Sequence, residues 1–199
     1  MKILLIGASG TLGRAVAAEL GARHDIIRAG RASGDVRLDL ADRASIEAAF
    51  AHLGKVDAIA CAAGEVAFAP LLDLGEGQWQ FSLAHKLMGQ VNLALTGSRH
   101  LQDGGSITLT TGILSTRPIV AGAAASLVNG GLESFVRAAS IELPRRQRIN
   151  AVSPGVLLES MPLYAPYFRG FEPVPAARAA LAFSRSIEGA ETGQVYRIG

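Results

Sequence analysis

A glycine-interrupted turn near the start of the chain constrains the fold more than any other stretch. An apolar run, Lys2 to Ile6, breaks into Gly7-Ala-Ser-Gly-Thr-Leu-Gly13 and then resumes with the spacing of an amphipathic helix. A strand that turns this tightly into a helix leaves backbone N–H groups unpaired at the positive end of the helix dipole. This context favours a dinucleotide site over a glycine turn that binds nothing. The residues expected to hold its phosphates are Gly7, Ser9, Gly10, Thr11, Leu12 and Gly13.

The pattern after the turn predicts a single α/β domain over residues 1–199. Apolar residues make up 49% of the chain and charged residues 18%, which suits strands that are buried on both faces of a parallel sheet. Strand and helix patterns alternate along the chain, with about seven strands. The expected fold is therefore a Rossmann-like, doubly wound parallel sheet with helices on both faces.

The composition argues against several other classes of protein. We interpret the one dense basic run, Arg145-Arg146-Gln147-Arg148, as a solvated loop rather than a nucleic-acid surface, because no stripe of basic and aromatic residues accompanies it. The histidines lack metal-ligand spacing, so no metal site is expected. No apolar run is long enough to cross a membrane, and Gly7 interrupts the first one too early for a secretion signal. The single cysteine, Cys61, favours a reducing compartment, so we expect a cytoplasmic protein.

The end of the second predicted strand, residues 25–29, indicates which dinucleotide fits. An acidic side chain there accepts the ribose 2′-hydroxyl of NAD, whereas an arginine suits the 2′-phosphate of NADP. Here the strand runs into Gly30-Arg31-Ala32-Ser33, without an acidic residue at its tip. Arg31 and Ser33 offer a guanidinium and a hydroxyl to a phosphate, so NADP is favoured over NAD. The alternative for Arg31 is an arginine that only faces solvent.

Two further turns are expected to lie beside the cofactor. Asp39-Leu40 follows a short strand, residues 36–38, at the carboxyl edge of the sheet, where an adenine would lie. Ala62-Ala63-Gly64 follows a buried strand, residues 56–60, and its small residues allow a cofactor to approach the backbone closely. Tight packing against the first turn would require the same residues.

Two long helices are predicted over about 78–101 and about 121–143. The second is rich in Ala, Gly and Ser, which lets another helix pack closely and predicts a homodimer or homotetramer formed through the long helices. The segment 156–175 carries Tyr164, Tyr167 and Phe168 among several prolines, and we interpret it as an irregular lid loop over a pocket. Its aromatic residues suggest a small apolar or aromatic carbonyl compound as the substrate.

Together these motifs resemble the short-chain dehydrogenase/reductase family over essentially the whole chain. The resemblance lies in the family's cofactor turn, adenine contact, Asn-Ala-Gly turn, nicotinamide segment and closing strand, which correspond to Gly7–Gly13, Asp39-Leu40, Ala62-Ala63-Gly64, Asn150–Gly155 and Thr192–Val195. Ala62 replaces the asparagine of the third motif. The resemblance implies a nicotinamide cofactor, with Pro154 and Gly155 added to the binding residues, and hydride exchange with a small carbonyl or alcohol substrate.

The resemblance fails at the catalytic positions. The family carries a serine on the fifth strand and Tyr-x-x-x-Lys on the following helix, where the tyrosine exchanges a proton with the substrate and the lysine lowers the pKa of that tyrosine. Here Ala125 stands at the tyrosine position and Asn129 at the lysine position. The serine position falls near Thr111 or Gly112, with Ser115 in reach.

Two functions therefore remain open. In the first, the protein is an NADP-dependent oxidoreductase in which Lys86, Thr111 or Tyr164 replaces the missing acid, and Asn129 is a further candidate catalytic residue. Lys86 stands where the family has an asparagine, and an apolar pocket would lower the pKa of its ammonium toward the useful range. Alternatively, Lys86 pairs with a cofactor phosphate or a carboxylate, or lies on the outer face. In the second function, the fold binds NADP without hydride transfer, as a sensor or scaffold.

Overall fold

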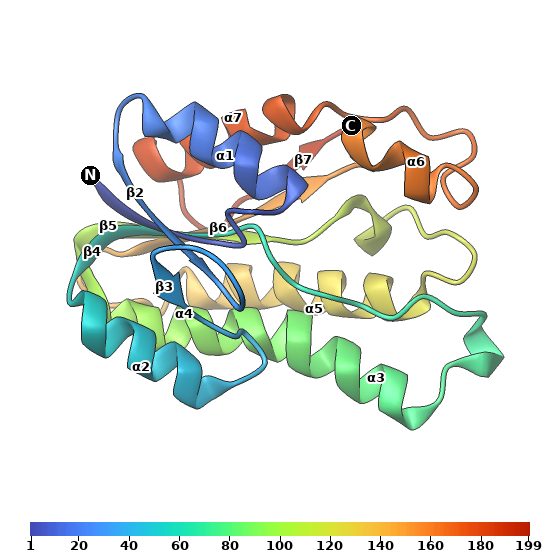
Figure 1. Cartoon of the computed structure of the whole chain (residues 1–199), viewed down its shortest axis with the longest axis horizontal. Coiled ribbons are helices and arrows are strands. Elements are labelled where there is room, and N and C mark those ends of the chain that lie inside the picture. The colour runs from blue at the N-terminus through green and yellow to red at the C-terminus, as the bar shows by residue number, and fades with distance from the viewer.

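Seven parallel strands form one sheet through the middle of the molecule (Figure 1), in a computed structural model that describes residues 1–199. The strand order is β3-β2-β1-β4-β5-β6-β7, and every neighbouring pair is parallel. The predicted class, a doubly wound parallel sheet of seven strands, is confirmed. The strands are β1 (Lys2–Ile6), β2 (Asp25–Gly30), β3 (Val36–Arg37), β4 (Val56–Cys61), β5 (Leu101–Thr110), β6 (Arg148–Pro154) and β7 (Val195–Ile198).

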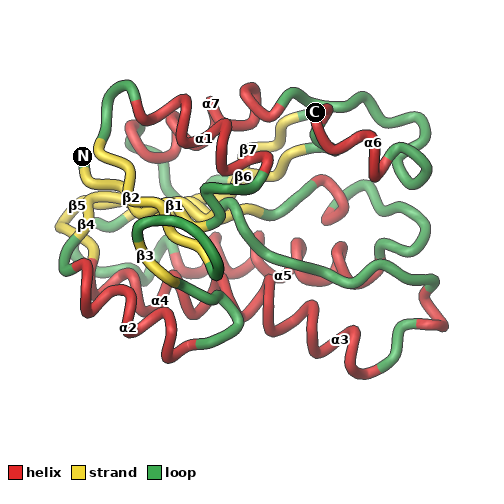
Figure 2. The backbone as a smooth tube through the Cα atoms, viewed as in Figure 1, coloured by secondary structure: helices red, strands yellow, loops and turns green.

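Helices cover both faces of the sheet. One face carries α1 (Thr11–Gly21) and α7 (Ala176–Glu188), and the other carries α2 (Arg43–Leu53), α4 (Gly89–His100) and α5 (Ala123–Ala139), as Figure 1 shows. The shorter helices α3 (Glu76–Ser82) and α6 (Met161–Tyr164) lie with long loops beyond the carboxyl ends of the strands (Figure 2). Loops from both layers therefore gather at that edge of the sheet.

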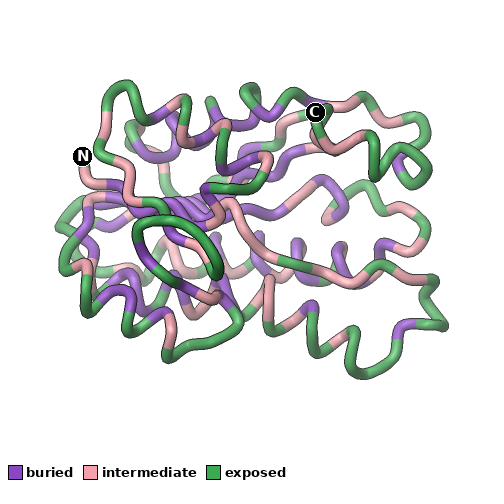
Figure 3. The backbone as a smooth tube through the Cα atoms, in the orientation of Figure 1, coloured by how far each residue is buried: buried purple, intermediate pink, exposed green.

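The core consists of two apolar layers, one on each face of the sheet. Figure 3 shows that buried residues run along the strands and recur on the helices that cover them. Side chains of β1 alternate between them: Leu4 packs in the layer under α2, α4 and α5, whereas Ile3 packs in the layer under α1 and α7. Both residues are fully buried. Because apolar side chains are needed on both faces, the strand is a continuous apolar run rather than an alternating one.

Several predicted helix ends are confirmed. Asp42 caps α2, since its carboxylate accepts a hydrogen bond of 2.9 Å from the N–H of Ala44. Gly54 ends the same helix with a φ of 68°, a backbone conformation that glycine adopts without strain. The first helix ends at Gly21 as expected.

The two long helices differ from the prediction. The helix expected over 78–101 consists of α3, a π-helical turn η2 (Leu83–Met88) and α4, and Leu101 already begins β5. The N–H of Gly89 bonds the carbonyl of Ala84, five residues back, so one extra residue is inserted into the helical ladder. The apolar spacing does not distinguish such an insertion from a regular helix. The helix expected over 121–143 is α5, which ends at Ala139 and continues only as turns.

The interpretation of residues 145–148 as a solvated loop holds only in part: Arg145 and Arg146 are exposed in a turn, whereas Gln147 is buried and Arg148 begins β6 half-buried. Arg145 donates a hydrogen bond of 2.7 Å to the carbonyl of Ser98 in the last turn of α4, and Arg148 donates one of 2.7 Å to the carbonyl of Ser186 in the last turn of α7. Helix C-termini leave carbonyls without partners, and arginine side chains satisfy them here. Arg145 and Arg148 therefore bind helix ends, while Arg146 stays exposed.

The fold predicts a test of the first turn. A Cβ on Gly13 would lie 2.0 Å from the carbonyl oxygen of Gly7, so we expect Gly13→Ala to lower the free energy of unfolding by about 1–3 kcal/mol. Gly77 in α3 has no atom within 4 Å of the corresponding position, and Gly77→Ala should raise that free energy by about 0.5–1 kcal/mol. Urea unfolding of both variants gives the comparison. Equal effects would mean that the turn is not packed this tightly.

Candidate functional site

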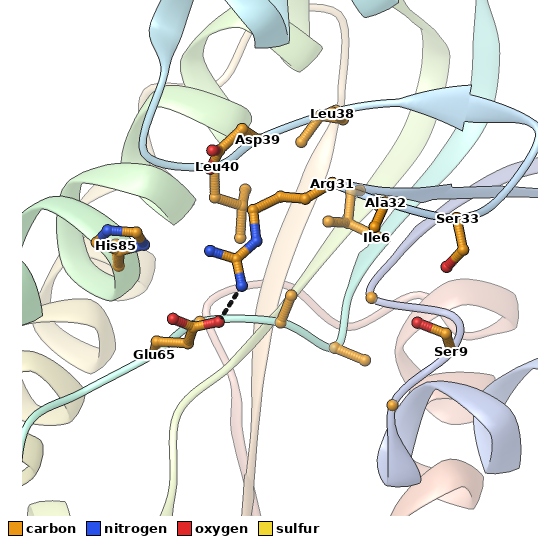
Figure 4. A pocket seen from close by; sticks show the side chains of 16 residues that line it. Ile6, Ser9, Arg31, Ala32, Ser33, Leu38, Asp39, Leu40, Glu65 and His85 are labelled. Carbon is orange, nitrogen blue, oxygen red and sulfur yellow. Dashed lines mark hydrogen bonds and ion pairs between the residues drawn. The ribbon is translucent and has the colours of Figure 1, made fainter.

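A cleft of about 350 Å³ opens at the carboxyl ends of β1, β2 and β4 (Figure 4). Ten of the residues predicted to bind the cofactor line it: Gly7, Ser9, Gly10, Arg31, Ser33, Asp39, Leu40, Ala62, Ala63 and Gly64. Six others complete its walls, among them two that the sequence did not single out for this site, Glu65 and His85. The structure thus brings together motifs that lie up to about 60 residues apart in the sequence.

The glycine turn has the properties of a phosphate cradle. Gly7 adopts a φ of 78° to turn the chain, and α1 begins directly after Gly10. The N–H groups of Thr11, Leu12 and Gly13 have no acceptor within the chain. These three residues form the first turn of α1 rather than the walls of the cleft, and their free N–H groups can bind an anion at the positive end of the helix dipole.

The turn after β4 packs directly on the glycine turn. A Cβ on Gly7 would lie 2.8 Å from Ala63 Cβ and 2.9 Å from the carbonyl oxygen of Ala62. Packing between the two turns therefore accounts for the small residues of Ala62-Ala63-Gly64. On its other side, Gly64 contacts the methylene groups of Lys86, since a Cβ there would lie 2.9 Å from Lys86 Cγ.

Asp39 and Leu40 lie where the sequence predicts an adenine. The carboxylate of Asp39 accepts a hydrogen bond of 3.0 Å from the N–H of Ala41, while its own N–H bonds the hydroxyl of Ser45 at 3.0 Å. Leu40 is buried and lines the cleft. The side chain of Asp39 is therefore held in place beside an apolar wall.

Arg31 and Ser33 stand at the end of β2, as predicted. Both are exposed, and the guanidinium of Arg31 reaches over the cleft to form an ion pair with Glu65 (Figure 4). The hydroxyl of Ser33 makes no hydrogen bond within the chain, so it is free to donate to a ligand. Glu65 was missed because a single acidic residue in a loop carries no pattern.

Lys86 lies in the π-helical turn, against the ends of β4 and β5. Its Nζ donates a hydrogen bond of 3.3 Å to the carbonyl of Thr111, which follows β5 directly. Burial lowers the pKa of the Lys86 ammonium to about 8, because an apolar environment disfavours the charged form. This contact excludes an outer-face position for Lys86, and the titratable group beside its ammonium is the thiol of Cys61 rather than a carboxylate.

A buried carboxylate, Glu133, lies beside the other predicted site residues. Its Oε1 accepts a hydrogen bond of 2.5 Å from the hydroxyl of Ser115, and the hydroxyls of Thr111 and Ser153 lie 3.5 Å from the same oxygen. Its Oε2 pairs with Arg197 of β7 at 2.8 Å. The sequence analysis missed Glu133, although its position one turn after Asn129 on the same helix face was a usable signal.

Ala125 and Asn129 lie on the buried face of α5. Ala125 packs in an apolar cluster with Ile113, Val156 and Phe168, so no hydroxyl group stands at this position. The amide of Asn129 lies against Gly112, where a Cβ would come within 3.1 Å of its Nδ2. The Oδ1 of Asn129 is buried and has no hydrogen-bond donor within the chain. An unpaired buried acceptor is costly, which makes it a candidate to receive a hydrogen bond from a ligand.

The segment 156–175 covers the edge of the sheet next to the end of β6. It is more ordered than an irregular loop, because it contains the short helix α6 and a strand-like bridge between Leu157 and Val174. Pro154 and Gly155 lie at its start, outside the 350 Å³ cleft. Tyr164 contacts Phe68 and Phe168, with ring centroids 6.3 Å apart in each pair. Aromatic rings from two loops therefore meet over this edge.

The structure contains no cluster of histidine, cysteine and acidic side chains that could hold a metal ion. None of its helices has the length and apolar character needed to span a membrane.

Comparisons with known proteins agree with this architecture. Residues 5–196 match a family described as Enoyl-(Acyl carrier protein) reductase. The protein lin1944 from Listeria innocua has a similar structure, with a TM-score of 0.99 and 50% identity over all of both chains. A small-chain dehydrogenase solved in complex with NADPH has a TM-score of 0.88 and 25% identity, over 100% of this chain and 96% of that one. Versicolorin reductase 1 of Dothistroma septosporum is 27% identical over 86% of this chain and 74% of its own length.

The fold, the glycine turn and the family match agree with one another over nearly the whole chain. The reductase relatives and the NADPH-bound neighbour support a nicotinamide cofactor and an oxidoreductase activity. This protein belongs to the short-chain dehydrogenase/reductase family.

Proposed function

We propose that the protein reduces a small carbonyl compound with NADPH, and that Lys86 supplies the proton. When bound, the cofactor supplies the hydride to the carbonyl carbon. The Lys86 ammonium donates its proton to the carbonyl oxygen and becomes a neutral amine. The observation that carries this proposal is the position of Lys86, which contacts Gly64 in the wall of the cleft and bonds the carbonyl of Thr111 at the end of β5.

The surroundings of Lys86 suit an acid at neutral pH. A general acid works best when its pKa lies near the working pH, and burial brings the pKa of this ammonium to about 8. The carbonyl of Thr111 orients Nζ, and Gly64 packs along its methylene groups. We assign the unpaired Oδ1 of Asn129 to a hydroxyl of the cofactor's ribose, because such a hydroxyl would satisfy this buried acceptor.

We assign the 2′-phosphate of the cofactor to Arg31 and Ser33. Their position at the end of β2, beside the cleft, places a guanidinium and a free hydroxyl where the family's fold decides between NAD and NADP. Arginine suits this role because its planar fork of N–H donors matches a phosphate.

An aromatic carbonyl compound is the substrate class we favour. Phe68, Tyr164 and Phe168 place aromatic rings over the carboxyl edge of the sheet. The relatives include versicolorin reductases, a probable tetrahydroxynaphthalene reductase and elsinochrome reductase 1. Rings of this kind bind a flat apolar substrate by stacking.

The second candidate function is an NADP-binding sensor or scaffold without hydride transfer. One observation favours it: Ala125 is packed among apolar side chains, so α5 has no hydroxyl at the position of the family's tyrosine. The cleft for the nucleotide would be the same in both cases. The two functions differ only in whether bound NADPH is oxidised.

The role of Lys86 predicts a pH dependence. Its proton is present below the pKa of about 8 and lost above it, so we expect the rate of carbonyl reduction to fall as the pH rises through about 8. Lys86→Met should lower the rate about 10²–10⁴-fold. Lys86→Arg should also lower the rate and abolish its fall near pH 8, because a guanidinium does not give up its proton. Absorbance of NADPH during single turnover with a panel of aromatic ketones gives the rate.

The matched control is Lys55→Met, since Lys55 is exposed at the opposite edge of the sheet and its loss should leave the rate unchanged. A rate for Lys86→Met equal to that of wild type would remove Lys86 from the mechanism. Tight NADPH binding without oxidation by any ketone would favour the sensor function.

The cofactor assignment predicts a difference between NADPH and NADH. Removal of a charged hydrogen-bond donor costs about 1.5–3 kcal/mol, so Arg31→Met should raise the Kd of NADPH about 10- to 100-fold. The Kd of NADH should not rise, because NADH has no 2′-phosphate. Fluorescence titration of both nucleotides measures this, with Arg43→Met as a control in an Arg–Glu pair outside the cleft. Equal losses for the two nucleotides would contradict the assignment.

We also propose that the protein is a homodimer or homotetramer formed through α4 and α5. Leu95, which is 54% exposed, borders a groove of about 520 Å³ between these helices, and Leu127 on α5 is 49% exposed. Large apolar side chains in this position are typical of a surface that another chain covers.

The buried free thiol of Cys61 fits a reducing compartment such as the cytoplasm.

Leu95→Arg tests this assembly. A charge at the border of the groove should leave the fold intact, because the side chain is half exposed, but should dissociate the oligomer to a monomer of 20.7 kDa. Light scattering coupled to size exclusion measures the mass, and Leu181→Arg on α7, also exposed, is the control. A wild-type monomer would refute the proposal, and so would a mass that is unchanged by Leu95→Arg.

A further inference from the structure

The Arg31–Glu65 ion pair crosses the mouth of the nucleotide cleft. Arg31 follows β2 and Glu65 lies shortly after β4, and these strands flank β1 in the sheet. The pair therefore joins residues from the two sides of β1, and the dashed line in Figure 4 marks it. Both residues line the cleft.

Neither side chain has another polar partner. Arg31 makes no further hydrogen bond, and Glu65 accepts none besides that of Arg31. The side chains are 53% and 49% exposed, so water and salt screen the pair. Exposed ion pairs of this kind shift an equilibrium by about two- to fivefold. The pair is therefore weak enough for a ligand to break and strong enough to be measured.

We propose that Glu65 is a specificity-determining residue that competes with the 2′-phosphate of the cofactor for Arg31. The inference rests on the proposed role of Arg31 in NADP binding. The cleft has its volume of about 350 Å³ while the pair is closed, so an adenosine without a 2′-phosphate can enter with Arg31 still held by Glu65. A 2′-phosphate binds Arg31 only after the carboxylate has released it.

The competition has a defined direction. A phosphate carries more charge than a carboxylate and offers more acceptor oxygens to the guanidinium, so it displaces Glu65 from Arg31. The displaced carboxylate remains on the cleft wall and repels the phosphate. Both effects make the affinity for NADP lower than Arg31 alone would give. Glu65 thus makes the difference in affinity between NADP and NAD smaller.

Adenosine 2′,5′-bisphosphate and AMP test this competition, since they differ only in the 2′-phosphate. Calorimetry gives their Kd values with wild type, Glu65→Gln, Arg31→Met and the double variant. We expect Glu65→Gln to lower the Kd of the bisphosphate about two- to fivefold and to leave the Kd of AMP unchanged. In the Arg31→Met background the same substitution should have a smaller effect, because the pair no longer exists.

Glu47→Gln is the matched control, since Glu47 forms an exposed pair with Arg43 outside the cleft and its loss should change neither Kd. Glu65→Ala, checked for an unchanged melting temperature, guards against an effect specific to glutamine. The competition is overturned if Glu65→Gln leaves the bisphosphate Kd unchanged or raises it. It is also overturned if Glu65→Gln tightens bisphosphate binding equally in the Arg31→Met background, because the effect would then be charge repulsion alone.

The same titration separates failure of this inference from failure of the proposed NADP preference. Wild type that binds the bisphosphate no more tightly than AMP would refute the role of Arg31 and the competition with it. Wild type that prefers the bisphosphate, together with a Glu65→Gln variant of unchanged affinity, would refute only the role of Glu65.

Discussion

The contact between the two small-residue turns sets the geometry on which the rest of this site depends. Gly7 has no room for a Cβ, because Ala62 and Ala63 of the neighbouring turn already occupy the space. This contact places the N-terminus of α1 beside the end of β4, next to the part of the cleft that Gly7, Ser9 and Gly10 line. Gly64, in the same turn as Ala62 and Ala63, packs against the methylene groups of Lys86. One close backbone approach thus links the phosphate cradle to the candidate acid.

The carboxyl edge of the sheet holds two separate groups of polar residues. The cleft on the β2 side is lined by Arg31, Asp39 and Glu65, and the free backbone N–H groups of α1 lie next to it. On the β6 side, the buried carboxylate of Glu133 accepts a hydrogen bond from Ser115 and pairs with Arg197. Lys86 lies between them, bonded to Thr111. The fold alone does not determine catalysis, so the chemistry at this edge depends on these side chains.

Sequence reasoning found the features that depend on neighbouring residues. The glycine turn, the Asp42 cap and the strand-helix alternation are local, and the structure confirms each as a structural element. It could not find Glu65, whose partner lies 34 residues away, because side-chain pairing across a cleft depends on the folded sheet. It also missed the π-helical turn, since one inserted residue barely alters the apolar spacing. The site assignments themselves stay predictions until the variants are measured.

The π-helical turn has a genetic consequence. Each residue of a helix turns the chain by about 100°, so deletion of the codon for Leu87 or Met88 would restore a regular ladder and rotate the two flanking halves relative to each other by that angle. Gly89 packs on Leu40, and α4 is fixed against the sheet, so the preceding half would have to turn. An in-frame deletion could then move Lys86 away from Thr111 while the core stays intact. A lineage could lose this ammonium from its pocket without any change in the lysine codon.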